Sequence, residues 1–164
     1  MPARSICLYP ESILRKPAKF VKKLTTYHRN VIRDLLDTLR LQPGGIGIAA
    51  PQIGYADQIA IVDVRKKDSS KRLHVMINPI ILSVTNSQTG REGCMSLPDY
   101  TGNVSRAQKI KVKWRNELFE ECEMTTEGIE AICIQHEIDH LNGLLFIDKV
   151  ASMDRDVFRR KKYL

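Results

Sequence analysis

Residues 135–140 contain the arrangement on which metal-assisted hydrolysis depends. On an α-helix, His136 and His140 lie one turn apart on the same face, so both imidazoles can reach one small cation. Glu137 follows the first histidine and can take a proton from a water molecule beside that cation. The spacing H-E-x-x-H predicts a metal-dependent hydrolase, although such five-residue matches also occur by chance on ordinary helix surfaces.

The flanking residues favour a buried helix. Thr125 and Thr126 are expected N-caps, and Asn142-Gly143 is an expected C-terminal stop. Buried histidines and carboxylates need partners, and a metal satisfies the histidines directly. Apolar residues cover more than one side of this helix, as is typical of a buried one: Ile129, Ile132, Cys133, Ile134, Ile138 and Leu141.

Composition indicates a globular protein, which we expect to be one domain over residues 1–164. Hydrophobic residues make up 43% and charged residues 27%. No apolar run is long enough for a membrane span, and the first residues lack the apolar core of a secretory signal, so we expect a cytoplasmic protein. The net charge of +7 favours encounters with acidic surfaces but does not indicate specific DNA binding.

The remaining pattern predicts an α+β fold, with antiparallel β-sheets packed around the central helix that carries the H-E-x-x-H motif. Residues 26–41 have helical periodicity, with Tyr27, Val31, Leu35 and Leu39 on one face. Expected strands cover residues 58–64, 73–78, 109–115, 118–124 and 144–147. Residues 86–90 are expected to form a polar loop, and residues 148–164 a basic C-terminal tail for which a terminal helix is one option.

A glycine-rich segment covers residues 45–54. A nucleotide-binding loop is one interpretation, but that loop follows a strand and opens a helix, whereas this segment follows a helix and is interrupted by Pro51. The glycines are better suited to bringing extended backbone close to a ligand. A plain turn without a ligand is the alternative.

A catalytic metal site needs a third protein ligand, and the residues alone leave three sources open. Downstream, Phe146 occupies the third histidine position of one peptidase class, which leaves only later aspartates. Cys133 lies three residues before His136 but about 10 Å along the helix axis from His140, which is awkward for a shared ion. Cys94 lies in an expected loop rich in glycine, serine and proline, and a loop thiol can reach a buried helix.

Three motifs in order give the sequence a resemblance to the peptide deformylases, which remove the formyl group from new polypeptides. They are G-x-G-x-A-A-x-Q at 45–52, E-G-C-x-S at 92–96 and Q-H-E-x-D-H at 135–140. The resemblance implies that Cys94, His136 and His140 bind the metal, expected to be Fe²⁺ with Ni²⁺, Co²⁺ or Zn²⁺ as substitutes. It also implies that Glu137 is the general base and later the acid.

The same resemblance implies an oxyanion site and a peptide site. The Gln52 side chain and the Met95 N–H would hold the formyl oxygen. The peptide would bind as an added strand beside the glycine segment, and its methionine side chain would enter a pocket. The residues implied for peptide and methionine are Gly45, Ile46, Gly47, Gly93, Ile129, Ile132 and Cys133, with His136, and a supporting ion pair would join Glu92 to Arg106.

Thr101 and the basic tail leave questions open about substrate and partner binding. Thr101 stands where some family members carry a substrate-contacting arginine. The basic tail would suit ribosomal RNA, with a solvated charged end as the alternative; its basic residues are Arg155, Arg159, Arg160, Lys161 and Lys162. The expected substrates are formyl-methionyl nascent peptides, and the alternative functions are a metallopeptidase or a non-catalytic ribosome-associated homologue.

Overall fold

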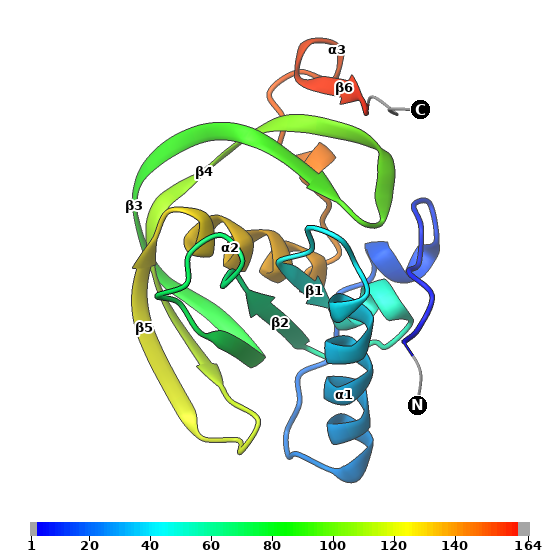
Figure 1. Cartoon of the computed structure of the whole chain (residues 1–164), viewed down its shortest axis with the longest axis vertical. Helices are drawn as coiled ribbons and strands as arrows, with labels where there is room; N and C mark the ends of the chain where they lie inside the picture. Colours follow the sequence, from blue (N-terminus) through cyan, green and yellow to red (C-terminus); the bar gives the residue numbers. More distant parts are fainter. Residues whose placement is uncertain (1–2, 161–164) are drawn as a thin grey trace.

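The computed structural model describes residues 3–160. Figure 1 shows helix α2 in the middle of the molecule, with the long curved strands β3 and β4 passing around it. In chain order the elements are η1 (Ser12–Arg15), α1 (Thr26–Arg40), β1 (Gly47–Ala49), η2 (Ala50–Ile53), β2 (Ile59–Asp63), β3 (Leu73–Cys94), β4 (Leu97–Arg115), β5 (Glu121–Glu127), α2 (Ile129–Leu141), η3 (Phe146–Asp148), α3 (Met153–Asp156) and β6 (Val157–Arg159).

The strands form one antiparallel sheet in the order β1-β2-β3-β4-β5, and β6 pairs with β4 beside this path. The predicted α+β class with antiparallel strands is therefore confirmed. The strand expected at residues 109–115 is part of β4. There Ile110, Val112 and Trp114 are buried while the adjacent Lys109 and Lys111 are exposed, so this part of β4 has one face in solvent.

The β3–β4 hairpin is longer than predicted. The prediction of a polar loop at residues 86–90 is wrong, because these residues belong to β3. Ser87 to Gly90 pair with Ala107 to Val104 in regular register, and the chain reverses only between Cys94 and Leu97. The side chains of Asn86, Ser87 and Thr89 are exposed. Their polar character therefore reflects contact with water and not an irregular backbone.

Other local predictions also fail for physical reasons. The strand expected at 144–147 is the 3-10 helix η3, because the Asp148 carboxylate accepts the Leu145 N–H and closes a turn. Strand β5 continues through both expected threonine caps, and α2 instead begins after Gly128, whose φ is 70°. In the expected tail, the helix predicted as one option is present as the short α3, and strand β6, which was not predicted, follows it. Residues 161–164 lie outside the described part of the chain.

Helix α1 covers one side of the sheet through its predicted apolar face. Val31, Leu35 and Leu39 are buried in a cluster with residues of β1 and β2. Tyr27 differs from the prediction, because it is half-exposed and its hydroxyl donates a 2.8 Å hydrogen bond to Asp57. Helix α2 packs against β1, β2, β4 and β5, so the residues of the motif are held from several sides.

Within residues 3–160, none of the helices combines the length and the apolar character that crossing a bilayer would require.

Replacing Asp34 with asparagine is expected to reduce the free energy of unfolding by about 1–3 kcal/mol at pH 7. Burial raises the pKa of Asp34, but hydrogen bonds from Arg4, Tyr55 and Arg33 outweigh burial and lower it. A lowered carboxyl pKa stabilises the fold above the pKa of the unfolded chain, about 4, and this contribution is lost as pH falls through the folded value. Denaturant unfolding at pH 7 and pH 3 should therefore show a difference between variant and wild type that shrinks in acid.

The matched control is Asp154→Asn, because Asp154 is exposed and should change stability little at either pH. A deficit of the Asp34 variant that is as large at pH 3 as at pH 7 would contradict the electrostatic explanation.

Candidate metal centre

Helix α2 presents two histidines towards the same small space. His136 and His140 are one turn apart, and their ring centroids are 4.9 Å from each other. The helix ends at Asn142, and Gly143 then takes a positive φ of 76° while its Cα lies against the backbone of Arg15. The C-terminal stop predicted at Asn142-Gly143 is therefore confirmed, and it anchors the end of the helix that carries His140.

Cys94 reaches the histidines from the end of strand β3. Its Sγ atom lies 3.3 Å from His140 Nε2. One ligand atom from each of Cys94, His136 and His140 can be chosen so that all lie within 4.8 Å of one another. Cys94 was expected in a loop, but it is the last residue of β3, so strand pairing and the tight turn that follows fix its position.

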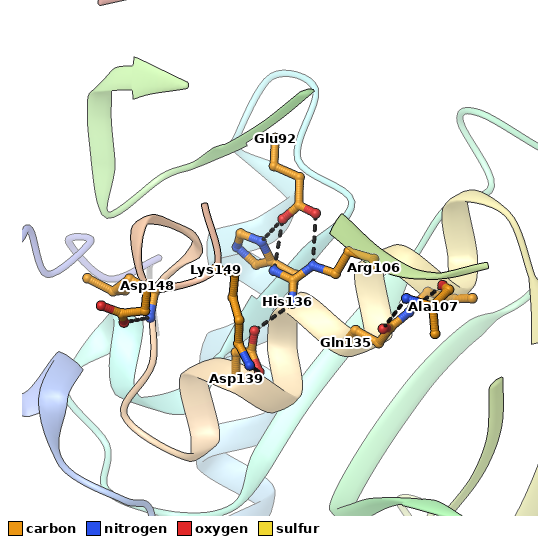
Figure 2. A network of polar contacts seen from close by, with 10 residues as sticks. Glu92, Arg106, Ala107, Gln135, His136, Asp139, Asp148 and Lys149 are labelled. Carbon is orange, nitrogen blue, oxygen red and sulfur yellow. Dashed lines mark hydrogen bonds and ion pairs between the residues drawn. The ribbon is translucent and has the colours of Figure 1, made fainter. Parts of the chain in front are cut away.

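A buried ion-pair network orients His136 (Figure 2). Its Nδ1 lies 2.9 Å from Glu92, and the same carboxylate accepts two 2.9 Å hydrogen bonds from the Arg106 guanidinium. Burial raises the pKa of Glu92, but the hydrogen bonds from His136 and Arg106 outweigh it and lower that pKa to about 2. The carboxylate therefore remains charged and engages Nδ1, which leaves Nε2 as the nitrogen that His136 can offer to a cation.

Sequence reasoning assigned no role to Gln135, Asp139 or Ser96, although all three belong to the motifs given above. The Gln135 amide exchanges hydrogen bonds with both backbone groups of Ala107, and Asp139 binds the far side of Arg106 (Figure 2). These contacts tie α2 to β4. Their only signal in the sequence is the presence of polar residues in a helix expected to be buried.

Glu137 is held in the apolar interior beside the histidines. It is 4% exposed, and its Oε2 has no hydrogen-bond partner in the described structure. Burial raises the pKa of Glu137 to about 7, a value suited to accepting and returning a proton near neutrality. A β-carbon at Gly47 would overlap Glu137 Oε1 and Cys133 Sγ, so only glycine allows β1 to pass this close.

The Gln52 amide is held in one orientation beside Cys94. Its Oε1 accepts the Ala49 N–H at 2.9 Å, so its Nε2 points to the other side. There Nε2 donates to Ser96 Oγ at 3.2 Å and lies 3.6 Å from Cys94 Sγ. A fixed amide N–H beside the candidate metal centre can stabilise a developing oxyanion.

A cavity of about 470 Å³ opens onto these groups. Gln52 and His140 lie behind its wall, in contact with Cys94, and Arg106 lies behind Glu92. The cavity also reaches Gln42, Pro43, Gly44, Arg91, Pro98 and Arg160. The residues expected at the site that line it are Gly45, Ile46, Gly47, Glu92, Gly93, Cys94, Met95, Ile129, Ile132, Cys133, His136 and Glu137.

The side chains at this place suit a divalent cation. One thiol and two imidazoles are ligands that zinc and first-row transition metals accept. Burial lowers the pKa of His136, but hydrogen bonds to Cys94 and Glu92 outweigh it and raise that pKa to about 10. Burial and the neighbouring His136 lower the pKa of His140, which leaves that imidazole neutral with a lone pair to offer. These surroundings thus favour positive charge at His136, and a cation bound there would take the place of the proton on that imidazole.

Comparison with known families now decides the identity. The family model described as polypeptide deformylase matches residues 3–156. The chain belongs to this family. It is 40% identical to a peptide deformylase of Mesorhizobium japonicum over 162 residues, which are 98% of this chain and 92% of that protein. It is 39% identical to one of Desulfotalea psychrophila over 98% of this chain and 95% of that protein.

Solved structures agree with this assignment. A peptide deformylase from Legionella pneumophila superposes with a TM-score of 0.85 at 37% identity, covering 93% of this chain and 89% of that one. A peptide deformylase from Synechococcus elongatus in complex with actinonin superposes with a TM-score of 0.85 at 34% identity, covering 93% of this chain and 81% of that one. The predicted family and activity are confirmed: the enzyme is a hydrolase that removes the N-terminal formyl group from nascent peptides. The family is metal-dependent, and Cys94, His136 and His140 form a possible metal-binding group here.

Proposed function

We propose that Cys94, His136 and His140 hold one divalent cation per chain and that the formyl group of formyl-methionyl peptides is hydrolysed beside it. The observation that carries this proposal is the convergence of three ligand atoms within 4.8 Å from two separate elements, β3 and α2. When bound, the cation supplies Lewis-acid activation of water. Glu92 and Arg106 keep His136 in the orientation that offers its Nε2.

Glu137 is proposed to transfer the proton. As a carboxylate it takes a proton from the attacking water, and as the acid it returns that proton to the amine that leaves with the peptide. Its Oε2 has no hydrogen-bond partner among the described residues, so it is available for this proton transfer. Formate is the second product.

Gln52 and Met95 are proposed to stabilise the formyl oxygen as it becomes negative. The Gln52 Nε2 is aimed at the Cys94 side by the hydrogen bond from Ala49 to its Oε1. The Met95 N–H lies in the turn between β3 and β4, and Met95 lines the cavity. Two donors that are already in place need little reorganisation as the charge develops.

The peptide is proposed to bind as an additional strand across the cavity. Strand β1 is at the edge of the sheet, and Gly45, Ile46 and Gly47 line one wall of the cavity while Gly93 lines another. Edge strands offer main-chain groups to an extended peptide. Ile129, Ile132 and Cys133, with His136, are proposed to surround the methionine side chain.

The function is tested by mixing the enzyme, prepared without oxygen, with a formyl-methionyl peptide that contains several internal bonds. We expect stoichiometric formate and a product that is shorter by the formyl group alone, with metal content measured on the same sample. Cleavage at internal bonds would favour a metallopeptidase. Absence of formate from a fully loaded sample would favour a non-catalytic homologue.

Ferrous iron is the proposed natural ion, with nickel, cobalt or zinc as substitutes. Activity of the ferrous enzyme is expected to decay in air and to survive longer when nickel replaces iron, because Fe²⁺ and a coordinating thiolate are both oxidised readily. The measurement is the half-life of formate release under air for both forms. Equal half-lives would count against ferrous iron as the ion beside Cys94.

We also propose that residues 1–164 are a single catalytic domain acting in the cytoplasm, and that the basic segment 148–164 contacts ribosomal RNA. Arg155, Arg159 and Arg160 are exposed, as such a contact requires. Lys161 and Lys162, which also led to this prediction, lie outside the described residues.

A further inference from the structure

The C-terminal strand β6 lies beside the start of β4, at the end of the long hairpin that carries Cys94 (Figure 1). Thr101 pairs with Phe158, and Gly102 pairs with Val157. The Arg160 N–H donates a 2.7 Å hydrogen bond to the carbonyl oxygen of Asp99, which continues the pairing by one residue. The backbone of β6 is thereby fixed as far as Arg160.

Side chains hold β6 in this position. The Arg91 guanidinium carbon lies 3.8 Å from the centre of the Phe158 ring, and Arg91 also donates to Thr101 at 3.3 Å and Asn103 at 3.1 Å. A β-carbon at Gly102 would lie 3.0 Å from the Asp156 carbonyl oxygen, so the segment that leads into β6 packs directly on β4. The stacking of Arg91 on Phe158 and the packing of Asp156 on Gly102 therefore both hold the segment that leads to Arg160.

From this strand the Arg160 side chain reaches the catalytic cavity. A β-carbon added to Gly93 would collide with its Nη2, and Arg160 is one of the residues that line the cavity. On β4, the residue paired with Gly93 is Thr101, which is uncharged. An uncharged side chain thus faces Gly93 from β4, and the guanidinium of Arg160, the residue after β6, lies across the same part of the wall.

The Arg160 guanidinium has no hydrogen-bond or ion-pair partner among residues 3–160. The two charged side chains nearest to Gly93 in sequence along β3, Glu92 and Arg91, are already engaged. Glu92 is bound by Arg106 and His136, and Arg91 is stacked on Phe158. Arg160 is therefore a positive charge at the cavity whose guanidinium donors are not engaged by any residue of the described part of the chain.

We propose that Arg160 is a specificity-determining residue that binds acidic groups in the substrate just after the formyl-methionine, at its second or third residue. The inference rests on the proposed path of the peptide beside Gly93. A guanidinium can give two parallel hydrogen bonds to a carboxylate, whereas it repels a lysine at the same place. The acceptor is thus a carboxylate of the nascent peptide, and the enzyme favours formyl-Met-Asp and formyl-Met-Glu termini over formyl-Met-Lys.

The test compares amidated peptides that begin with formyl-Met-Asp, formyl-Met-Ala and formyl-Met-Lys, so that no terminal carboxylate contributes. In the full-length enzyme at low salt, Arg160→Ala should lower the preference for Asp over Lys by about three- to tenfold, the range of a partly exposed charge pair. The change should lie in KM for the Asp peptide, with kcat and the Ala peptide nearly unaffected. Arg160→Lys should restore part of the preference.

Arg159→Ala is the matched control. It removes the same charge one residue away. Arg159 and Arg160 both line a second cavity beside Asp99 and Tyr100, but of the two only Arg160 also lines the catalytic cavity. Its Asp-to-Lys preference should equal that of the wild type. Equal preferences in the wild type and Arg160→Ala, equal losses in both variants, or a uniform fall in kcat for every peptide would each refute the role of Arg160. A wild-type enzyme that releases no formate from any peptide would instead refute the catalytic proposal.

Discussion

Replacing Glu137 with glutamine is expected to lower kcat for formate release by about 10²–10⁴-fold, the usual contribution of a positioned general base. Glutamine has nearly the same shape as glutamate but cannot accept the proton of the attacking water. Glu137 is not one of the three proposed ligands, so the metal content of the variant should equal that of the wild type. The measurement combines single-peptide kinetics with metal analysis of the same preparation.

The control for this variant is Glu123→Gln. Glu123 is exposed on β5, where it forms a 2.9 Å ion pair with Lys111. Exposed pairs of this kind contribute little to stability, so this variant should keep full activity. A fully metal-loaded Glu137→Gln enzyme that deformylates at the wild-type rate would show that another group is the base.

Removal of the Cys94 thiol should have the second large effect, which is a loss of affinity for the metal. In Cys94→Ala, two imidazoles remain, and we expect the affinity for the cation to fall by more than about 100-fold, since loss of even a supporting contact costs 10–100-fold. Activity should fall with the metal content. Cys94→Ser should also change the order of preference among iron, nickel, cobalt and zinc, because an oxygen ligand is harder than sulfur. Metal titration of the stripped protein measures both effects.

Cys133→Ser is the matched control for metal content. Cys133 is also buried and also lines the cavity, but its Sγ contacts the Ile46 carbonyl at 3.4 Å and it does not belong to the three-residue group. It should bind metal as the wild type does, whatever happens to its peptide affinity. A Cys94→Ala protein that is fully loaded and fully active would remove Cys94 from the ligand set.

The part of the site on α2 was predictable because it is local. The four-residue spacing of His136 and His140 places both on one helical face without any knowledge of the rest of the chain. The third ligand was not predictable from spacing alone. Cys94, Cys133 and several later aspartates remained open until the three motifs were compared with a family.

The errors of prediction share a cause. Polar residues in β3 were interpreted as a loop, and the apolar residues before η3 as a strand, because short segments carry no clear periodicity. In both places contacts with distant residues decided the conformation. Pairing of residues 87–90 with β4 keeps the polar segment of β3 extended. Burial of Leu145 and Phe146 beside Cys94 and Val104 stabilises the turn of η3.

The amino-acid sequence by itself determined the two-histidine helix, the α+β class and, through its motifs, the family and activity. These depend on local spacing and on residue types. Only the tertiary structure decided that Cys94 ends a strand within reach of His140, that His136 and Asp139 join the Glu92–Arg106 pair in one buried network, and that Arg160 lies across Gly93. Each of these requires residues far apart in the chain to meet, and strand register and packing, which local sequence does not encode, bring them together.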